Sequence, residues 1–292
     1  MDNDIKLINE IIHHKRKSKY IMDIFDKYSG DNFEIFKHEI DQDTDHIDIL
    51  TVFDYLNEYE QEKFINKCQQ NIFSDDLKLK IISDIDNTFI EAPFIAKNTY
   101  KTDIIIPGYM DIVKSMTKLP ITFISARPKI LENKTINKIS SLTNYKFSVL
   151  TGSVLPLIYE GVSWIIYNKL LSRLSHKKIA EGKYYNFIRW QKIFPHNKFL
   201  FFGDDSQGDH IFARKMIDRF PDALACIRRV MDDNIESEYI HPNIFYHRSY
   251  FHIIVLFNEY NLTNINDDKN DVNDYIDDDQ YEYDCKCIGR EI

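Results

Sequence analysis

The sequence predicts an α/β protein built on a parallel central sheet. From about residue 79 onward, short apolar runs alternate with longer segments in which apolar residues recur at helical spacing. The runs are nearly continuous, as in strands buried on both faces, and polar residues follow several of them directly. Strands that alternate with helices form right-handed βαβ units, and their carboxyl ends carry the ligand site. We therefore expect three layers, with helices on both faces of the sheet.

Five strands and five helices are predicted in this part of the chain. The predicted strands cover residues 80–83, 121–124, 146–149, 199–202 and 223–230. The predicted helices cover residues 108–118, 130–142, 175–194, 209–220 and 252–260. Each strand is short and each helix long enough to cross back over a sheet, which is the pattern that parallel strands require.

The regions on either side of this pattern have a different composition. Residues 5–28 and 45–73 carry apolar residues at helical spacing, with a polar stretch at residues 30–45 between them. Beyond residue 261 the chain is rich in Asn and Asp and poor in apolar residues, which is typical of disorder. These boundaries predict an N-terminal helical extension (residues 1–76), an α/β domain (77–261) and an acidic, disordered tail (262–292).

Composition excludes several classes of protein. The chain has 292 residues, 43% of them hydrophobic, and a net charge of −9. An acidic surface disfavours non-specific nucleic-acid binding, which needs many Lys and Arg residues against phosphate. The four cysteines are too few for a disulfide framework and indicate a reducing compartment. No apolar run is long enough to span a bilayer and no signal peptide is visible, so we expect a cytoplasmic protein with at most peripheral membrane contact.

The first reactive segment follows the first predicted strand and contains Asp84, Asp86 and Thr88. Two carboxylates held close together repel each other, and a divalent cation with a preference for hard oxygen ligands, such as Mg²⁺, relieves that repulsion. One carboxylate can attack phosphorus and form an acyl phosphate, while the other donates a proton to the leaving oxygen and later activates water. The structural alternative is a loop in which Asp and Thr act as helix N-caps.

Three later segments supply further candidates. Ser125 ends a predicted strand and can hold a phosphoryl oxygen, with Arg127 as a charged contact; a plain N-cap serine is the alternative. An acidic segment, residues 203–209, follows another strand, and buried acids in this position call for a cation. A lysine upstream of that strand would offset the charge of phosphate and nucleophile. The candidates are Lys177, Lys178, Lys183 and Lys192.

In this order, the motifs resemble those of the haloacid-dehalogenase superfamily of phosphatases. More narrowly, they resemble the catalytic domain of the actin-patch-associated phosphatidate phosphatases. That family has Ser-Asp-Ile-Asp-Asp-Thr where this chain has Ser83-Asp84-Ile85-Asp86-Asn87-Thr88. Its Pro-Gly, its Phe-Tyr-x-Ser-x-x-Pro and its Lys-Phe-x-x-x-Gly-Asp-Ser-Gly-Gln-x-Asp find looser counterparts at residues 107–108, 123–128 and 198–209. Its lysine before a Phe-Pro pair selects Lys183, and the resemblance covers about residues 80–261.

The resemblance implies a three-layer, Rossmann-like fold of the haloacid-dehalogenase type and a role for each matched residue. By carry-over, Asp84 is the nucleophile and a Mg²⁺ ligand. Asp86 is the general acid and base and lends a backbone carbonyl to the metal, and Thr88 orients Asp86. Ser125 and Lys183 hold the phosphoryl group. Asp204 binds the metal and Asp209 supports it.

This sequence departs from the family pattern at two positions. Asn87 replaces a family Asp outside the core catalytic positions. Asp205 adds a negative charge beside the predicted metal site.

Spacing between the motifs predicts that no large cap domain covers the site. An open site admits bulky substrates, and the leading expectation is a phosphomonoesterase acting on phosphatidate or a similar membrane lipid. The same chemistry on a nucleic-acid end or a phosphoprotein stays open, with nucleic acid disfavoured by the acidic composition. A catalytically silent binding protein with this fold is a further alternative, although it would have no chemical reason to keep Asp84, Asp86, Lys183 and Asp204.

Overall fold

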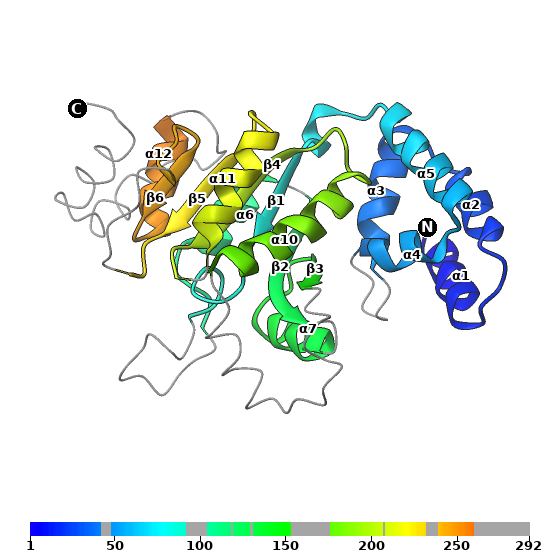
Figure 1. Cartoon of the computed structure of the whole chain (residues 1–292), viewed down its shortest axis with the longest axis horizontal. Coiled ribbons are helices and arrows are strands. Elements are labelled where there is room, and N and C mark those ends of the chain that lie inside the picture. Colours follow the sequence, from blue (N-terminus) through cyan, green and yellow to red (C-terminus); the bar gives the residue numbers. More distant parts are fainter. Residues whose placement is uncertain are drawn as a thin grey trace.

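The computed structural model describes residues 1–41, 48–91, 104–117, 119–128, 131–152, 176–206, 208–231 and 239–259 (Figure 1). Within these ranges one parallel sheet has the strand order β3-β2-β1-β4-β5-β6. Its strands are β1 (Leu79–Ser83), β2 (Ile121–Pro128), β3 (Phe147–Gly152), β4 (Lys198–Asp204), β5 (Leu224–Arg228) and β6 (Ile244–His247). The predicted parallel α/β sheet is confirmed.

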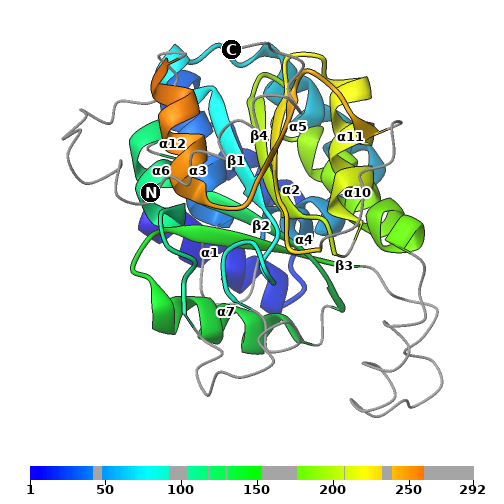
Figure 2. The same ribbon diagram turned by 90° about the vertical axis from the view of Figure 1, so that its left-hand side faces the viewer.

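Helices cover both faces of this sheet. One face carries α6 (Tyr109–Met116), α7 (Glu132–Leu142) and α12 (Tyr250–Glu259), and the other carries α10 (His176–Gln191) and α11 (Asp209–Arg219). Figure 2 shows α6 and α12 on one side of the strands and α10 and α11 on the other. Alternate residues of β4 serve the two layers: Phe199 and Phe201 pack toward α10 and α11, while Leu200 and Phe202 pack toward α6 and α12.

The strand order changes direction between β1 and β4. The chain moves outward from β1 through β2 to β3, and α10 then returns it to β4 on the opposite side of β1. Such a topological switch point leaves a crevice at the carboxyl ends of the two strands, and ligands of open α/β sheets bind there. Asp84 follows β1 and Asp204 ends β4, so the two predicted acids meet at this point.

Among the described residues, five α-helices precede the sheet and gather at one end of the molecule (Figure 1). They are α1 (Asp2–His13), α2 (Lys19–Phe25), α3 (Gly30–Asp41), α4 (Ile49–Tyr55) and α5 (Glu58–Gln70). Their buried side chains belong to the same core as those of α10, which includes Phe187 and Trp190. The five helices therefore pack on the α10 layer.

Helix α3 corrects the sequence prediction, which assigned residues 30–45 to a polar connection. Phe33, Phe36 and Ile40 lie on its inner face and are fully buried. Several charged residues of α3 are also buried, so their polarity does not mark a loop. Lys37 donates a hydrogen bond to the Ile193 carbonyl at 2.7 Å and lies 2.8 Å from a Glu34 carboxylate oxygen. These contacts anchor α3 to the end of α10.

Two more differences concern the helix boundaries and one strand. Two segments were each predicted as one helical stretch but contain two helices. Residues 5–28 contain α1 and α2, and residues 45–73 contain α4 and α5. The break in the second segment falls at Asn57, whose side chain caps α5 in a capping box with Glu60. The edge strand β6 was not predicted.

Several predictions fall outside the described residues. These are the disordered tail (262–292, with Cys285 and Cys287) and two stretches between the motifs, residues 92–103 and 153–175, on which the absence of a cap depends. Within the described ranges, no helix is long and apolar enough to cross a membrane.

Removing one partner of the buried Lys37–Glu34 pair should destabilise the protein far more than breaking an exposed ion pair. Replacing Lys37 with Met removes the bond to Ile193 and leaves Glu34 buried without that cation. We expect a loss of about 3–5 kcal/mol in the free energy of unfolding, measured by chemical denaturation. Lys63→Met is the control, because the Lys63–Asp26 pair is about half exposed and should cost under about 1 kcal/mol. Equal losses in the two variants would contradict the anchoring role of α3.

Candidate active site

Asp84 lies directly after β1, with its side chain buried at the switch point. Its backbone N–H continues the ladder by donating to the Phe202 carbonyl at 2.8 Å. One carboxylate oxygen, Oδ1, accepts a hydrogen bond of 2.6 Å from Lys183. The other, Oδ2, is buried and has no partner among the described residues. Burial raises the pKa of Asp84 to about 7, against the opposing effect of the Lys183 ammonium.

Lys183 reaches this point from α10 and is itself only 1% exposed. Its Nζ also donates to Asp209 Oδ1, at 2.5 Å, so one ammonium group joins β1 to the first residue of α11. Burial alone would lower the pKa of Lys183, but Asp209 and Asp84 more than offset this and raise it. The other three candidate lysines, Lys177, Lys178 and Lys192, are exposed.

Asp204, the last residue of β4, is the third buried carboxylate. Ser206 donates to its Oδ1 through both the backbone N–H and the hydroxyl group. Oδ2 is buried and has no partner among the described residues. Burial, together with the charges of Asp209 and Asp84, raises the pKa of Asp204 well above its usual range.

Gly203 allows the Asp209 side chain to lie close to the end of β4. A Cβ there would lie 2.7 Å from the Asp209 side chain and 2.6 Å from the Phe201 ring, closer than real Cβ contacts. Gly208 caps α11 with a φ of +84°, where a side chain would also meet the backbone of His176. The two glycines let the β4–α11 loop turn tightly enough to bring Asp209 back to Asp204.

Asp84, Asp204 and Asp209 can together hold a metal ion. Each offers one carboxylate oxygen, and the three oxygens lie within 4.8 Å of one another. A single Lys183 offsets only one of the three negative charges, and two buried oxygens have no hydrogen-bond donor. Hard oxygen ligands of this kind suit Mg²⁺. The donor set therefore fits the predicted cofactor.

Asp86 lies outside this carboxylate group and contacts Arg127 instead. Arg127 Nη2 donates to both carboxylate oxygens of Asp86 at 2.7 Å, and Nη1 donates to Thr135 at 3.3 Å. The two charged side chains are about one quarter exposed. Ser125, buried within β2, accepts a hydrogen bond from the Arg127 backbone N–H. Arg127, for which the sequence predicts a substrate contact, is thus paired with Asp86.

Thr88, predicted to orient Asp86, makes no hydrogen bond to that residue. The Thr88 hydroxyl is buried and has no hydrogen-bond partner within the described part of the chain. Its carbonyl accepts a bond from the Tyr250 hydroxyl on α12. Asn87, which takes a left-handed φ of 60°, turns the chain here, and its carbonyl accepts a bond from Arg228 at 2.8 Å.

Asp205, the extra acid of this sequence, has its own partners. Arg229 Nε donates to Oδ2 at 3.0 Å, and the backbone N–H groups of Val230 and Met231 donate to Oδ1. Its charge is therefore balanced by the chain after β5 rather than added to the carboxylate group.

Sequence reasoning did not assign three residues that support the site: Ser206, Thr135 and Arg228. Ser206 and Arg228 lie inside or beside the recognised motifs, so their position was a usable signal. Thr135 lies on α7, outside the recognised motifs, and gave no signal in the sequence.

Comparison with protein-family models found no match, and comparison with curated proteins found none either.

Magnesium should stabilise the protein through Asp204. We expect Mg²⁺ to raise the melting temperature of the wild type, by the equivalent of about 2.7 kcal/mol at a concentration 100-fold above the dissociation constant. Asp204→Asn should abolish this rise. Asp205→Asn is the matched control, because Asp205 faces Arg229 and should leave the Mg²⁺-induced rise unchanged. The same loss in both variants would argue against the assigned ligands.

Proposed function

We propose that the chain is a Mg²⁺-dependent phosphomonoester hydrolase of the haloacid-dehalogenase type. One observation carries the proposal: a buried aspartate at the switch point has one oxygen bound by a buried lysine and the other without a partner, beside two further carboxylates. Nucleophilic carboxylates that form acyl phosphates need this combination of a fixed orientation, a cation nearby and an unbound oxygen.

The reaction proceeds in two displacements. In the first, a carboxylate oxygen of Asp84 attacks phosphorus, the bond from phosphorus to the ester oxygen breaks, and Asp86 gives a proton to the leaving alcohol. In the second, water attacks the aspartyl phosphate, Asp86 takes a proton from that water, and the bond between Asp84 and phosphorus breaks to release inorganic phosphate. Ser125 and Lys183 hold the phosphoryl oxygens.

Asp84, Asp204 and Asp209 would hold Mg²⁺, with the Asp86 backbone carbonyl as a further ligand. When bound, the ion would supply positive charge against the phosphoryl oxygens. Lys183, on α10, stabilises the negative charge of the same oxygens. Its ion pair with Asp209 fixes the direction of the Lys183 side chain before substrate arrives.

The motif resemblance favours a bulky ester such as phosphatidate at a membrane surface. A phosphorylated nucleic-acid end and a phosphoprotein would use the same chemistry. Rates of phosphate release from a lipid, an oligonucleotide and a peptide substrate distinguish these classes.

Asp84→Asn should abolish turnover while leaving the fold intact, because the amide cannot act as the nucleophile. Phosphate release is measured with Mg²⁺ on p-nitrophenyl phosphate, phosphatidate in mixed micelles, a 5′-phosphorylated oligonucleotide and a phosphopeptide. Asp111→Asn, on the exposed side of α6, is the matched control and should retain wild-type rates. Substantial activity in Asp84→Asn would remove the nucleophile from its role. A folded, Mg²⁺-binding wild type that is inactive on the whole panel would favour the binding-protein alternative.

Arg127 should act as a positioning residue for Asp86. We expect Arg127→Met to lower kcat by about 10²-fold on alkyl phosphates, since a misplaced general acid no longer protonates the leaving alcohol. The loss should be much smaller for p-nitrophenyl phosphate, whose leaving group departs without a proton. Equal losses on the two substrates, or a change confined to KM, would assign Arg127 to substrate binding alone.

A further inference from the structure

Hydrogen-bond donors already engage several carboxylate oxygens of the candidate active site. Lys183 donates to Oδ1 of both Asp84 and Asp209. The Asp204 backbone N–H donates to Asp209 Oδ2 at 3.3 Å, and Ser206 donates twice to Asp204 Oδ1. The oxygens of this group that lack a donor within the described chain are Asp84 Oδ2 and Asp204 Oδ2. Asp84 and Asp204 therefore each present a single free oxygen to a cation.

Single free oxygens favour a small cation over a large one. Ca²⁺ takes about six to eight oxygen ligands and accepts both oxygens of one carboxylate. Mg²⁺ requires near-octahedral geometry and is usually held by one or two carboxylates, with water in the remaining positions. A carboxylate whose second oxygen is held by hydrogen bonds therefore suits Mg²⁺ better than Ca²⁺.

Ser206 is itself oriented by Asn87, which is only 4% exposed. The Asn87 side-chain nitrogen, Nδ2, donates a long hydrogen bond of 3.4 Å to Ser206 Oγ. Because Oγ accepts this bond, its own hydrogen is directed to Asp204 Oδ1. Arg228 Nη1 in turn holds the Asn87 carbonyl at 2.8 Å. A chain of hydrogen bonds thus runs from β5 through Asn87 and Ser206 to the acid at the end of β4.

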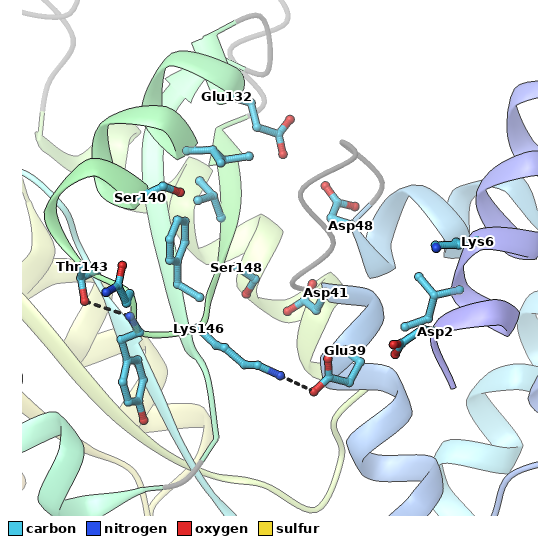
Figure 3. A pocket seen from close by; sticks show the side chains of 16 residues that line it. Asp2, Lys6, Glu39, Asp41, Asp48, Glu132, Ser140, Thr143, Lys146 and Ser148 are labelled. Carbon is cyan, nitrogen blue, oxygen red and sulfur yellow. Dashed lines mark hydrogen bonds and ion pairs between the residues drawn. The ribbon is translucent and has the colours of Figure 1, made fainter.

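The largest acidic cleft of the described chain offers no competing site for a divalent cation. This cleft, of about 590 Å³, lies between the N-terminal helices and β3, and its carboxylates have partners of their own. Figure 3 shows Glu39 paired with Lys146 across it, and Asp41 accepts a hydrogen bond from Trp190. Among the described residues, the group close enough to hold a metal ion is that of Asp84, Asp204 and Asp209. Binding of a divalent cation therefore reports on the candidate active site.

We propose that Ser206, oriented by Asn87, is a positioning residue that sets the preference of this site for Mg²⁺ over Ca²⁺. By holding Asp204 Oδ1, Ser206 limits Asp204 to one oxygen for the cation. This inference rests on the proposed function, because it takes the same three acids as the cation site, but it concerns binding and not turnover.

The test titrates the full-length protein with Mg²⁺ and, separately, with Ca²⁺ in a calorimeter, without substrate. The wild type should bind Mg²⁺ more tightly. Ser206→Ala leaves Asp204 Oδ1 with only the backbone donor, and should weaken Mg²⁺ binding by about tenfold. Binding of Ca²⁺ should change much less, since Oδ1 becomes available to the larger ion.

Two further serine variants control for the substitution itself. Ser206→Thr keeps the hydroxyl group and should keep the wild-type ratio of the two affinities. Ser141→Ala removes an exposed serine from α7 and should change neither affinity.

Asn87→Asp separates orientation from charge. The two side chains have nearly the same shape, and both tolerate the left-handed φ of 60° at this position. The carboxylate cannot donate to Ser206 and accepts its hydrogen instead, drawing it away from Asp204. An added negative charge alone would strengthen the binding of both cations. We expect the ratio of Mg²⁺ to Ca²⁺ affinity to fall as in Ser206→Ala, with no further fall in the double variant.

Three results would overturn the proposal: an unchanged affinity ratio in Ser206→Ala, an unchanged ratio in Asn87→Asp, or a wild type that prefers Ca²⁺. Each of them leaves the proposed hydrolase standing if the wild type releases phosphate with Mg²⁺. The expected affinity ratios in a protein that releases phosphate from no substrate would instead contradict the proposed function and leave the positioning role of Ser206 in place.

Discussion

The ammonium group of Lys183 lies buried between Asp84 and Asp209, and the rest of the candidate site depends on this contact. It joins α10, β1 and α11 at one point and offsets one of three buried negative charges. Hydrogen-bond donors balance the remaining charge only in part: Ser206 donates to Asp204 Oδ1, but Asp84 Oδ2 and Asp204 Oδ2 have no donor within the described chain. In the proposed function, such a site would receive a divalent cation and a phosphoryl group, and Lys183 would hold Asp84 in place before either arrives.

The fold brings these groups together through its strand order. β1 and β4 are neighbours in the sheet although more than a hundred residues separate them in the chain, and the reversal between them creates the crevice. Within it, Gly203 removes the side chain that would push Asp209 away. The charge of Asp205, next in sequence to Asp204, is taken up by Arg229. Adjacent acids thus have different roles, one facing the crevice and one holding the loop after β5.

The sequence was informative where local pattern and position coincide. Apolar runs marked five of the six strands, and an acid directly after a run marked Asp84 and Asp204, because the ends of parallel strands share one edge. The pattern failed where tertiary contacts override polarity. The sequence of α3 looks polar because it contains Glu34 and Lys37, but these two side chains pair with each other and are buried. That burial is visible only in three dimensions. The contact between Asp86 and Arg127 was likewise inaccessible, because it spans two strands and depends on side-chain direction. β6 is short, with a buried histidine at its end, and carried too little signal.

In the proposed mechanism Asp84 becomes phosphorylated, and chemical trapping tests this step most directly. The protein is mixed with substrate and Mg²⁺, quenched in acid and reduced with borohydride, which converts an aspartyl phosphate into homoserine. Mass spectrometry of the digested chain then locates the reduced residue. We expect reduction at Asp84 alone, dependent on substrate and absent in Lys183→Met. Phosphate release by the wild type with no reduced aspartate, or with reduction at another position, would contradict it.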